Sequence, residues 1–494
     1  MLSPVFNTLA ICLLTSAFAV PVGGFLAITV QRTNLFGRGV AWLCIGSQLT
    51  LPLYVFAGGW CAMFGTQGWL PALVPALKQT ESVGSVLIVS SIHALAMIPW
   101  VFVVCSLGLL NRSRAIEETA NLEGGWLRTL LRVIVPQLRP WLIAAAAVCC
   151  LPVLTEMVVT NLFRVPSVAE QVYLDISLGT VRPWTYVAIS LLTMLPVVLG
   201  GLLWQRTLPP WREILLHAYD SPQPIDLAQH RFTVSLATWG VIIATVFAPI
   251  LSLIIKAGWT PNLADSGQST YSWTTTRFAT TVYEGATLFG EQLQWSVLLA
   301  LTSALVAATF ASLLFACTIN RPVAHILLSL AMLIIVSVPG PAVAMLVSFL
   351  MNRSQPPGLT YLYDFTIAAP VFAQQFRLLP YAWLITIATA ASISKSTLEQ
   401  LKLDGISAPW SVIYELRNLI SKPALAGIAL LAAISFGELS CSLLVLPAGM
   451  TTLSKQLFEF LHFGMRHQDS ALCGLFILVS WGMSLLLRKT LMER

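Results

Sequence analysis

Charged residues are scarce in this sequence, and their scarcity excludes most classes of protein. Asp, Glu, Lys and Arg together make up 10% of the 494 residues, whereas hydrophobic residues make up 57%. Ordinary soluble domains carry roughly 25% charged residues. A soluble fold of this length would have too little charge to cover its surface, so we exclude that class.

Several sequence motifs are also missing. The nine cysteines form no C-x-x-C pair and join no histidine cluster, which argues against a disulfide framework or a zinc site. The chain has no G-x-x-x-x-G-K-[ST] loop to hold a nucleotide phosphate, and no H-E-x-x-H. We therefore expect no catalytic residue, no metal site and no cofactor bound by this chain, which is not predicted to be an enzyme.

Long apolar stretches dominate the sequence instead. A helix made from such a stretch can cross a hydrocarbon layer of about 30 Å. We therefore predict an all-α polytopic membrane protein with about 11 transmembrane helices. The predicted spans cover residues 5–30, 39–63, 84–107, 139–160, 183–204, 232–256, 294–317, 323–349, 377–393, 423–446 and 471–487.

The basic residues are distributed in a way that indicates the orientation of the chain. Arg32 and Arg38 follow the first span, and Arg488, Lys489 and Arg494 lie in the C-terminal tail. Since cytoplasmic segments are enriched in Lys and Arg, this distribution places the N-terminus outside and the C-terminus inside. The net charge of +6 follows from that topology, so we expect contact with membrane lipid and none with nucleic acid.

Short motifs recur in the same order at a nearly constant offset of 281 to 287 residues, which indicates an internal duplication. The matched pairs are Thr15-Ser16 with Thr302-Ser303, Pro52 with Pro339, Pro99-Trp100 with Pro380-Tyr381, Glu118 with Glu399, Gly124 with Gly405, and Glu156 with Glu438.

The duplication is predicted to be parallel. The first helix and its repeat are the first and seventh predicted spans, six apart in order, so both run in the same direction, unlike the inverted repeats of many secondary transporters. We predict a first transmembrane half over residues 1–204 and a second over 232–494. The intervening residues 205–231 are rich in proline and charge and are expected to form a cytoplasmic linker.

Two polar segments, residues 111–138 and 394–422, are the most informative part of the duplication. Each contains a Glu followed by Leu, an acidic residue and Gly, and then an amphipathic stretch. In the first segment the apolar residues at helical spacing are Ile116, Ala120, Leu127, Leu131 and Ile134. A short surface helix turned by a glycine is a rigid element that can pass a push from a soluble partner to the neighbouring spans.

These residues resemble the cytoplasmic loop motif of type I ABC importer permeases: Glu-Ala-Ala, three residues, Gly, nine residues, then Ile-x-Leu-Pro. Glu118-Thr119-Ala120, Gly124 and Ile134-Val135-Pro136 match it in the first segment. Glu399-Gln400-Leu401 and Gly405 match it in the second, which lacks the closing proline. Counting from Glu117 would place Glu123 at the glycine position, and the offset of 281 favours Glu118 and Gly124.

Residues 6–38 and 436–464 also resemble segments of double-length permeases from the branch that handles iron(III), thiamine and phosphonates. The resemblance implies two type I ABC permease bundles in a bacterial inner membrane. It implies two ABC ATPase subunits that hold ATP, and a periplasmic solute-binding protein that delivers iron(III) or a similar small solute. The implied coupling residues are Glu118, Ala120, Gly124, Ile134, Pro136, Glu399 and Gly405.

Two carboxylates lie near the outer ends of equivalent spans. Glu156 and Glu438 are expected either to line a pathway or gate for a cationic solute or to cap a broken helix. A secondary active transporter with two parallel helical halves is the alternative function. It would require proton-linked acids deep in the bilayer and would not need two Glu-Gly cytoplasmic loops.

Overall fold

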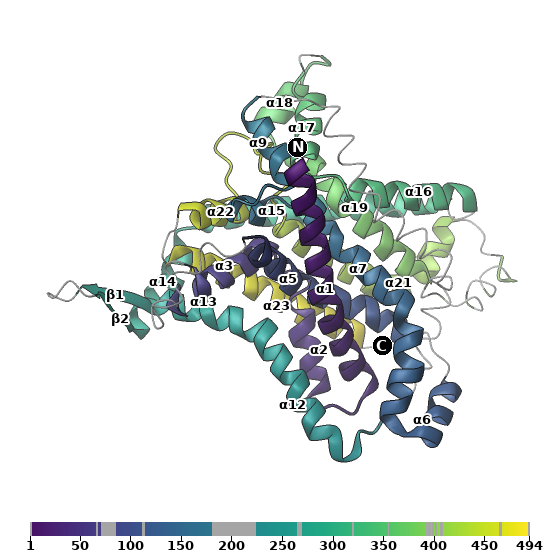
Figure 1. Ribbon diagram of the computed structural model, residues 1–494. Helices are drawn as coiled ribbons and strands as arrows, with labels where there is room; N and C mark the ends of the chain where they lie inside the picture. Colours follow the sequence, from purple (N-terminus) through teal and green to yellow (C-terminus); the bar gives the residue numbers. More distant parts are fainter. Residues whose placement is uncertain are drawn as a thin grey trace.

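The computed structural model (Figure 1) describes most of the chain. It covers residues 2–65, 68–70, 85–110, 114–179, 224–263, 269–318, 321–353, 355–391, 393, 397, 400, 403–405, 409–463 and 467–492. The predicted span 183–204, most of the predicted linker and Glu399 lie outside the described residues.

Helices account for nearly all of the regular structure in the described part. The helices of the first predicted half are α1 (Leu2–Arg32), α2 (Arg38–Gly46), α3 (Leu53–Phe64), α5 (Ser85–Leu110), α6 (Arg114–Thr129), α7 (Val135–Thr155), α8 (Val158–Leu162) and α9 (Val168–Ser177). Those of the second are α12 (Arg231–Ile242), α13 (Ala248–Gly258), α14 (Thr275–Thr287), α15 (Gly290–Thr318), α16 (Pro322–Val336), α17 (Gly340–Met351), α18 (Leu359–Phe365), α19 (Ala368–Ala391), α21 (Pro409–Phe436), α22 (Leu453–Phe463) and α23 (Gln468–Met492).

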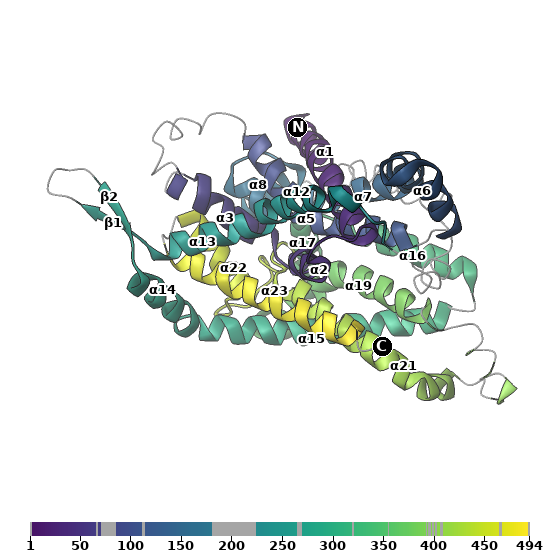
Figure 2. The ribbon, with the colours of Figure 1, turned by 90° about the horizontal axis from the view of Figure 1, so that it is seen from below.

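Three short segments complete the description. π-Helical turns, Leu130–Ile134 and Ile243–Phe247, join α6 to α7 and α12 to α13, and a 3-10 turn, Ala228–His230, precedes α12. Strands β1 (Trp259–Leu263) and β2 (Ser269–Trp273) form an antiparallel hairpin that projects from the helices (Figure 2).

Six helical stretches among the described residues are long and apolar enough to cross a membrane. They are Ser3–Arg32, Ser85–Leu109, Ile116–Thr155, Ala228–Gly258, Gly290–Thr318 and Gln468–Leu486. The pair α16 and α17 becomes a seventh if its bent halves count as one span. The chain is therefore an all-α multi-pass membrane protein, as its composition predicts.

The long helices pack as two sets of three. In the first set α1 contacts both α5 and α7, and α5 contacts α7. In the second set α15 contacts both α19 and α21, and α19 contacts α21. The repeated motifs pair α1 with α15 and α5 with α19, so each set uses corresponding helices in the same contacts.

Two predicted spans are broken. Residues 39–63 form α2 and α3, separated by turns that end at Pro52, and residues 323–349 form α16 and α17, bent by 103° around Pro339. The helix of predicted span 423–446 stops at Phe436, and turns follow. Proline removes a backbone donor and ends the helix before it, whereas hydropathy stays high across the break.

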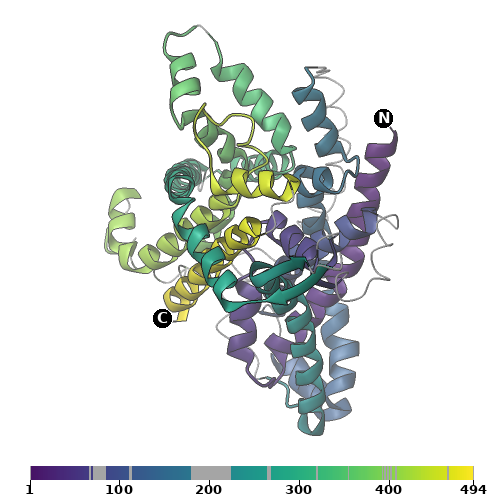
Figure 3. The ribbon, with the colours of Figure 1, turned by 90° about the vertical axis from the view of Figure 1, so that its left-hand side faces the viewer.

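Figures 1 and 3 show which elements share each end of the molecule. The N-terminal end of α1 lies at the upper end with α9, α17 and α18. The opposite, lower end holds α2, α6 and the beginning of α12. In Figures 1 and 2, α15 runs across the direction that α1 takes in Figure 1. The arrangement thus does not define one membrane normal, and the parallel orientation stays a prediction.

Close packing at the helix breaks gives a first testable expectation. A Cβ atom on Gly340 would lie 2.4 Å from the Cβ of Ser440, whereas one on Gly240 would meet nothing within 4 Å. We expect Gly340→Ala to lower the free energy of unfolding by about 1–3 kcal/mol through overpacking. Gly240→Ala, within α12, is the matched control and should be neutral or slightly stabilising. Thermal unfolding of the purified proteins in detergent compares them; equal melting temperatures would contradict the packing.

Candidate functional site

The first polar loop folds into a bent helix at the lower end of the molecule. α6 contains a non-helical break at Gly125, whose φ of 71° and ψ of 172° suit glycine alone. In the second loop Gly405 also has a positive φ, 74°. The sequence offset pairs Gly124 with Gly405, but the structure places the turn one residue later, because only one of the two adjacent glycines takes the left-handed conformation.

The predicted coupling residues of this loop occupy different environments. Glu118 is exposed, Ala120 is half-buried, and Ile134 is fully buried at the start of the bundle. Pro136 lies in the first turn of α7, directly after the π-helical turn Leu130–Ile134. Glu117, which the repeat offset disfavours as the motif glutamate, is the buried member of the pair Glu117–Glu118 and forms an ion pair with Arg32.

Each polar loop also presents one leucine almost entirely to solvent. Leu122 is 88% exposed and Leu403 is 87% exposed. They lie 281 residues apart, at the same position of the Leu-acidic-Gly motif. In the first loop Ile116, Leu127 and Leu131 are also exposed, so α6 and the turn after it carry an uncovered apolar surface.

A second group of functional candidates lies where four helix breaks meet. A Cβ on Gly437, after α21, would lie 2.3 Å from the Cγ of Pro52 in the α2–α3 break. A Cβ on Gly340, at the α16–α17 break, would contact Ser440 in the turn after α21. The Tyr54 hydroxyl donates to the carbonyl of Gly437 at 3.1 Å. We call this region the break cluster.

The two predicted carboxylates lie in the break cluster and cap its turns. Glu156 follows the last residue of α7 and accepts hydrogen bonds from the backbone N–H groups of Val158 (2.6 Å) and Val159 (3.2 Å). Glu438 accepts from the N–H of Cys441 at 2.8 Å. Both side chains are half-buried, and they interact electrostatically with each other. The structure therefore favours the capping role while also bringing the pair together.

Arg377 of α19 joins the two helix sets at the break cluster. Its guanidinium donates to the carbonyl of Thr155, at the end of α7, at 3.0 Å. It also donates to the carbonyl of Val336, at the end of α16, at 2.7 Å. Carbonyls at helix C-termini lack intrahelical partners and carry partial negative charge, so a cation fits there. Arg377 also interacts with both Glu156 and Glu438.

The sequence analysis missed Arg377, although one signal was present. It is an arginine within a predominantly apolar helix, and such a residue normally pairs inside the protein. The duplication hides it, because the corresponding position of the first half is Ala96. Near it, the repeat-related rings of Trp100 and Tyr381 meet with centroids 5.9 Å apart, so matched positions of the two sets touch.

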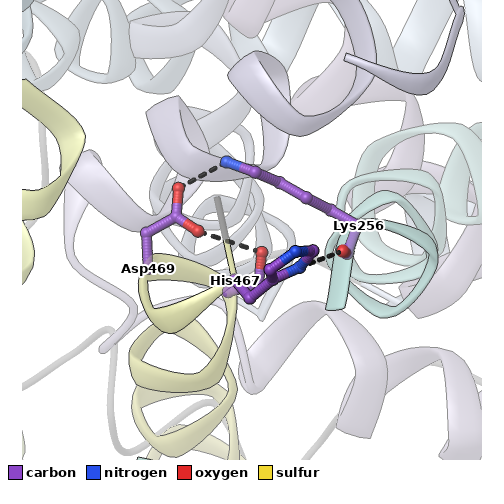
Figure 4. A network of polar contacts seen from close by, with 4 residues as sticks. Lys256, His467 and Asp469 are labelled. Carbon is purple, nitrogen blue, oxygen red and sulfur yellow. Dashed lines mark hydrogen bonds and ion pairs between the residues drawn. The ribbon is translucent and has the colours of Figure 1, made fainter. Parts of the chain in front are cut away.

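An ion pair fixes the last helix to the opening span of the second predicted half (Figure 4). Lys256, near the end of α13, pairs with Asp469 in the first turn of α23. His467 directs its Nδ1 to the backbone carbonyl of Lys256 at 3.2 Å. Both charged side chains are largely buried, which is tolerable because each neutralises the other.

A pocket of about 360 Å³ opens between α9 and α17 at the upper end. It is lined by Ile176, Ser177, Ala344, Met345, Ser348, Phe349 and Leu444, which come from both predicted halves. Also on α9, burial raises the pKa of the Glu170 carboxyl. Among the described residues, no three His, Cys, Asp or Glu side chains are grouped closely enough to hold a metal ion.

Comparisons with models of known protein families, with curated proteins and with solved structures find no match.

Removing Arg377 tests whether it holds the break cluster together. Arg377→Ala leaves two helix-terminal carbonyls without their donor, and we expect the free energy of unfolding to fall by about 1–3 kcal/mol. Arg353 is the matched control, because it is exposed and donates only within its own helix end, to Phe349 at 2.9 Å. Thermal unfolding should show a clear loss for Arg377→Ala and little change for Arg353→Ala. Equal losses would contradict the bridging role.

Proposed function

We propose that this chain is the transmembrane permease component of an ATP-driven ABC importer in a bacterial inner membrane. It forms the solute pathway and couples to two separate ABC ATPase subunits. A periplasmic binding protein delivers the solute, for which iron(III) or a similar small solute is proposed from the resemblance of residues 6–38 and 436–464. ATP is bound and hydrolysed by the partner subunits.

The exposed pair Leu122 and Leu403 carries this proposal. Burying a leucine side chain is worth about 1.5–3 kcal/mol, so a surface leucine gains most when a partner covers it. A single exposed leucine needs no explanation. Two leucines that are 88% and 87% exposed at the same motif position of a duplicated loop indicate a partner that binds both loops in the same way. Apolar anchors of this kind supply much of the affinity of an interface.

The arrangement of the helices supports a duplicated permease. α1, α5 and α7 make the same mutual contacts as α15, α19 and α21. Pro52 and Pro339 precede α3 and α17 with the same extended backbone, having φ of −63° and −55°. Together with the repeated motifs, these matches support an internal duplication. The parallel orientation of the halves, the total of about 11 transmembrane helices, the outside N-terminus and the inside C-terminus are proposed from the sequence pattern.

The break cluster is the proposed pathway or gate. Irregular backbone is tolerated at membrane depth only inside protein or beside a water-filled cavity. Glu156, Glu438 and Arg377 lie there on elements of both helix sets, and all three are half-buried. A pair of carboxyl groups at corresponding positions of the two halves suits a cationic solute.

The test is co-purification of the tagged chain with candidate ATPase subunits. Leu122→Ser combined with Leu403→Ser should reduce the recovered ATPase to less than about a tenth of the wild-type amount, because two anchors are lost. Leu178→Ser is the matched control, since Leu178 is 72% exposed but follows α9 at the upper end. It should leave recovery unchanged.

Two outcomes would overturn the proposal. If the double variant binds ATPase as well as the wild type does, the loops are not docking elements. If a stable, well-folded wild-type chain binds no ATPase, the importer is wrong and the secondary active transporter becomes the better explanation. Gly124→Glu with Gly405→Glu tests the same loops by placing a charge at each turn.

A further inference from the structure

A buried ion pair connects the first polar loop to α1. Arg32 is the last residue of α1, and Glu117 lies in the first turn of α6. Their side chains are 3% and 4% exposed, and they pair directly with each other. Withdrawing two charges from water is costly, and leaving one of them unpaired costs more still. The pair therefore fixes the beginning of α6 to the end of α1.

The break at Gly125 separates this part of α6 from α7. Residues 116–124, with the exposed Leu122, precede the break, and the chain leading into α7 follows it. Thr129 Oγ1 donates to the Gly125 carbonyl at 3.0 Å, which stabilises the start of the second part. The non-helical conformation of Gly125 interrupts the helix, so the first part of α6 and α7 do not form one continuous rod. The ion pair thus gives the first part of α6 a connection to the bundle that bypasses α7.

The end of α1 is in turn bound to the beginning of the second predicted half. The backbone carbonyl of Asn34 accepts from Arg231 Nε at 2.6 Å, and the carbonyl of Phe36 accepts from Trp239 Nε1 at 2.8 Å. The guanidinium of Arg231 also lies 4.0 Å from the centre of the Phe36 ring. α1 therefore passes directly into a loop that is held by α12.

The duplication does not repeat this ion pair. The offsets that align the two halves place Ile319 opposite Arg32 and Leu398 opposite Glu117. Neither is a charged residue, so the sequence has no equivalent ion pair at the repeat positions.

We propose that Arg32 is a positioning residue for coupling. It holds Glu117 so that movement imposed on the first polar loop passes to α1 and, through residues 33–37, to α12. The first loop thereby acts on both halves. The inference rests on the proposed function in one respect only: an ATPase is the source of the movement.

Hydrogen–deuterium exchange of the isolated chain in detergent tests the connection without any partner. Glu117→Gln should increase amide exchange in residues 114–124 by about tenfold, because the anchored segment opens more often. Exchange within α5 should stay unchanged. The double variant Arg32→Glu with Glu117→Arg restores opposite charges and should restore slow exchange. Glu123→Gln, an exposed residue on the same segment, is the matched control and should have no effect.

The connection would be overturned if amide exchange in residues 114–124 did not rise in Glu117→Gln. It would also be overturned if exchange were as fast in the charge-swapped double variant as in Glu117→Gln. If Glu117→Gln does not accumulate as folded protein, Arg32→Gln replaces it in the same comparison.

A second experiment uses the assembled transporter. Glu117→Gln keeps the exposed Leu122, so it should co-purify with ATPase as the wild type does. Its solute-stimulated ATP hydrolysis should fall by about tenfold and should recover in the double variant Arg32→Glu with Glu117→Arg. Unchanged stimulation would overturn the transmission role. Failure of the wild type to bind ATPase would overturn the proposed function and leave the exchange result standing.

Discussion

The need to satisfy backbone hydrogen bonds in an apolar medium explains the principal polar residues of the break cluster. A helix that breaks inside a membrane frees N–H and C=O groups that lipid cannot bind, at several kcal/mol for each group. In the described part of the chain four helix breaks meet in the break cluster, and side chains replace several of the missing partners there. Glu156 and Glu438 accept from the freed N–H groups, while Arg377 and Tyr54 donate to the freed carbonyls. The charged residues are therefore where the backbone requires them.

The same requirement places a polar region between the two helix sets. Because the breaks converge, their capping groups converge too, and Glu156, Glu438 and Arg377 come to interact through the fold. Most oxygens of the two carboxylates are already engaged with backbone groups. A solute bound at this position would compete with the backbone N–H groups for the oxygens of Glu156 and Glu438. Solute binding would therefore be linked to the geometry of the helix ends. The asymmetry of the region follows from Arg377, which has no counterpart in the first set.

The sequence predicts the class of fold well, because apolar length is a direct consequence of crossing a membrane. It also predicts the proline pair Pro52 and Pro339, although not that each precedes a new helix after a break. Hydropathy cannot detect those breaks, since the residues around them remain apolar. The sequence cannot tell which of Glu117 and Glu118 is buried, or which of Gly124 and Gly125 forms the turn. Adjacent identical residues look the same in a linear pattern, and only the packing of the folded chain distinguishes them.

The two candidate regions lie at opposite ends of α7. This helix begins after the polar loop and ends at Thr155, whose carbonyl Arg377 holds. Its 21 residues span roughly 30 Å at 1.5 Å per residue. Pro140 and Pro152 interrupt its hydrogen bonding, so α7 alone would bend under a push rather than transmit it. α1 contains one internal proline, packs along α5 and α7, and is anchored to the loop by Arg32. A movement of the loop that reaches the break cluster therefore travels better through α1 than through the helix that follows the loop in sequence.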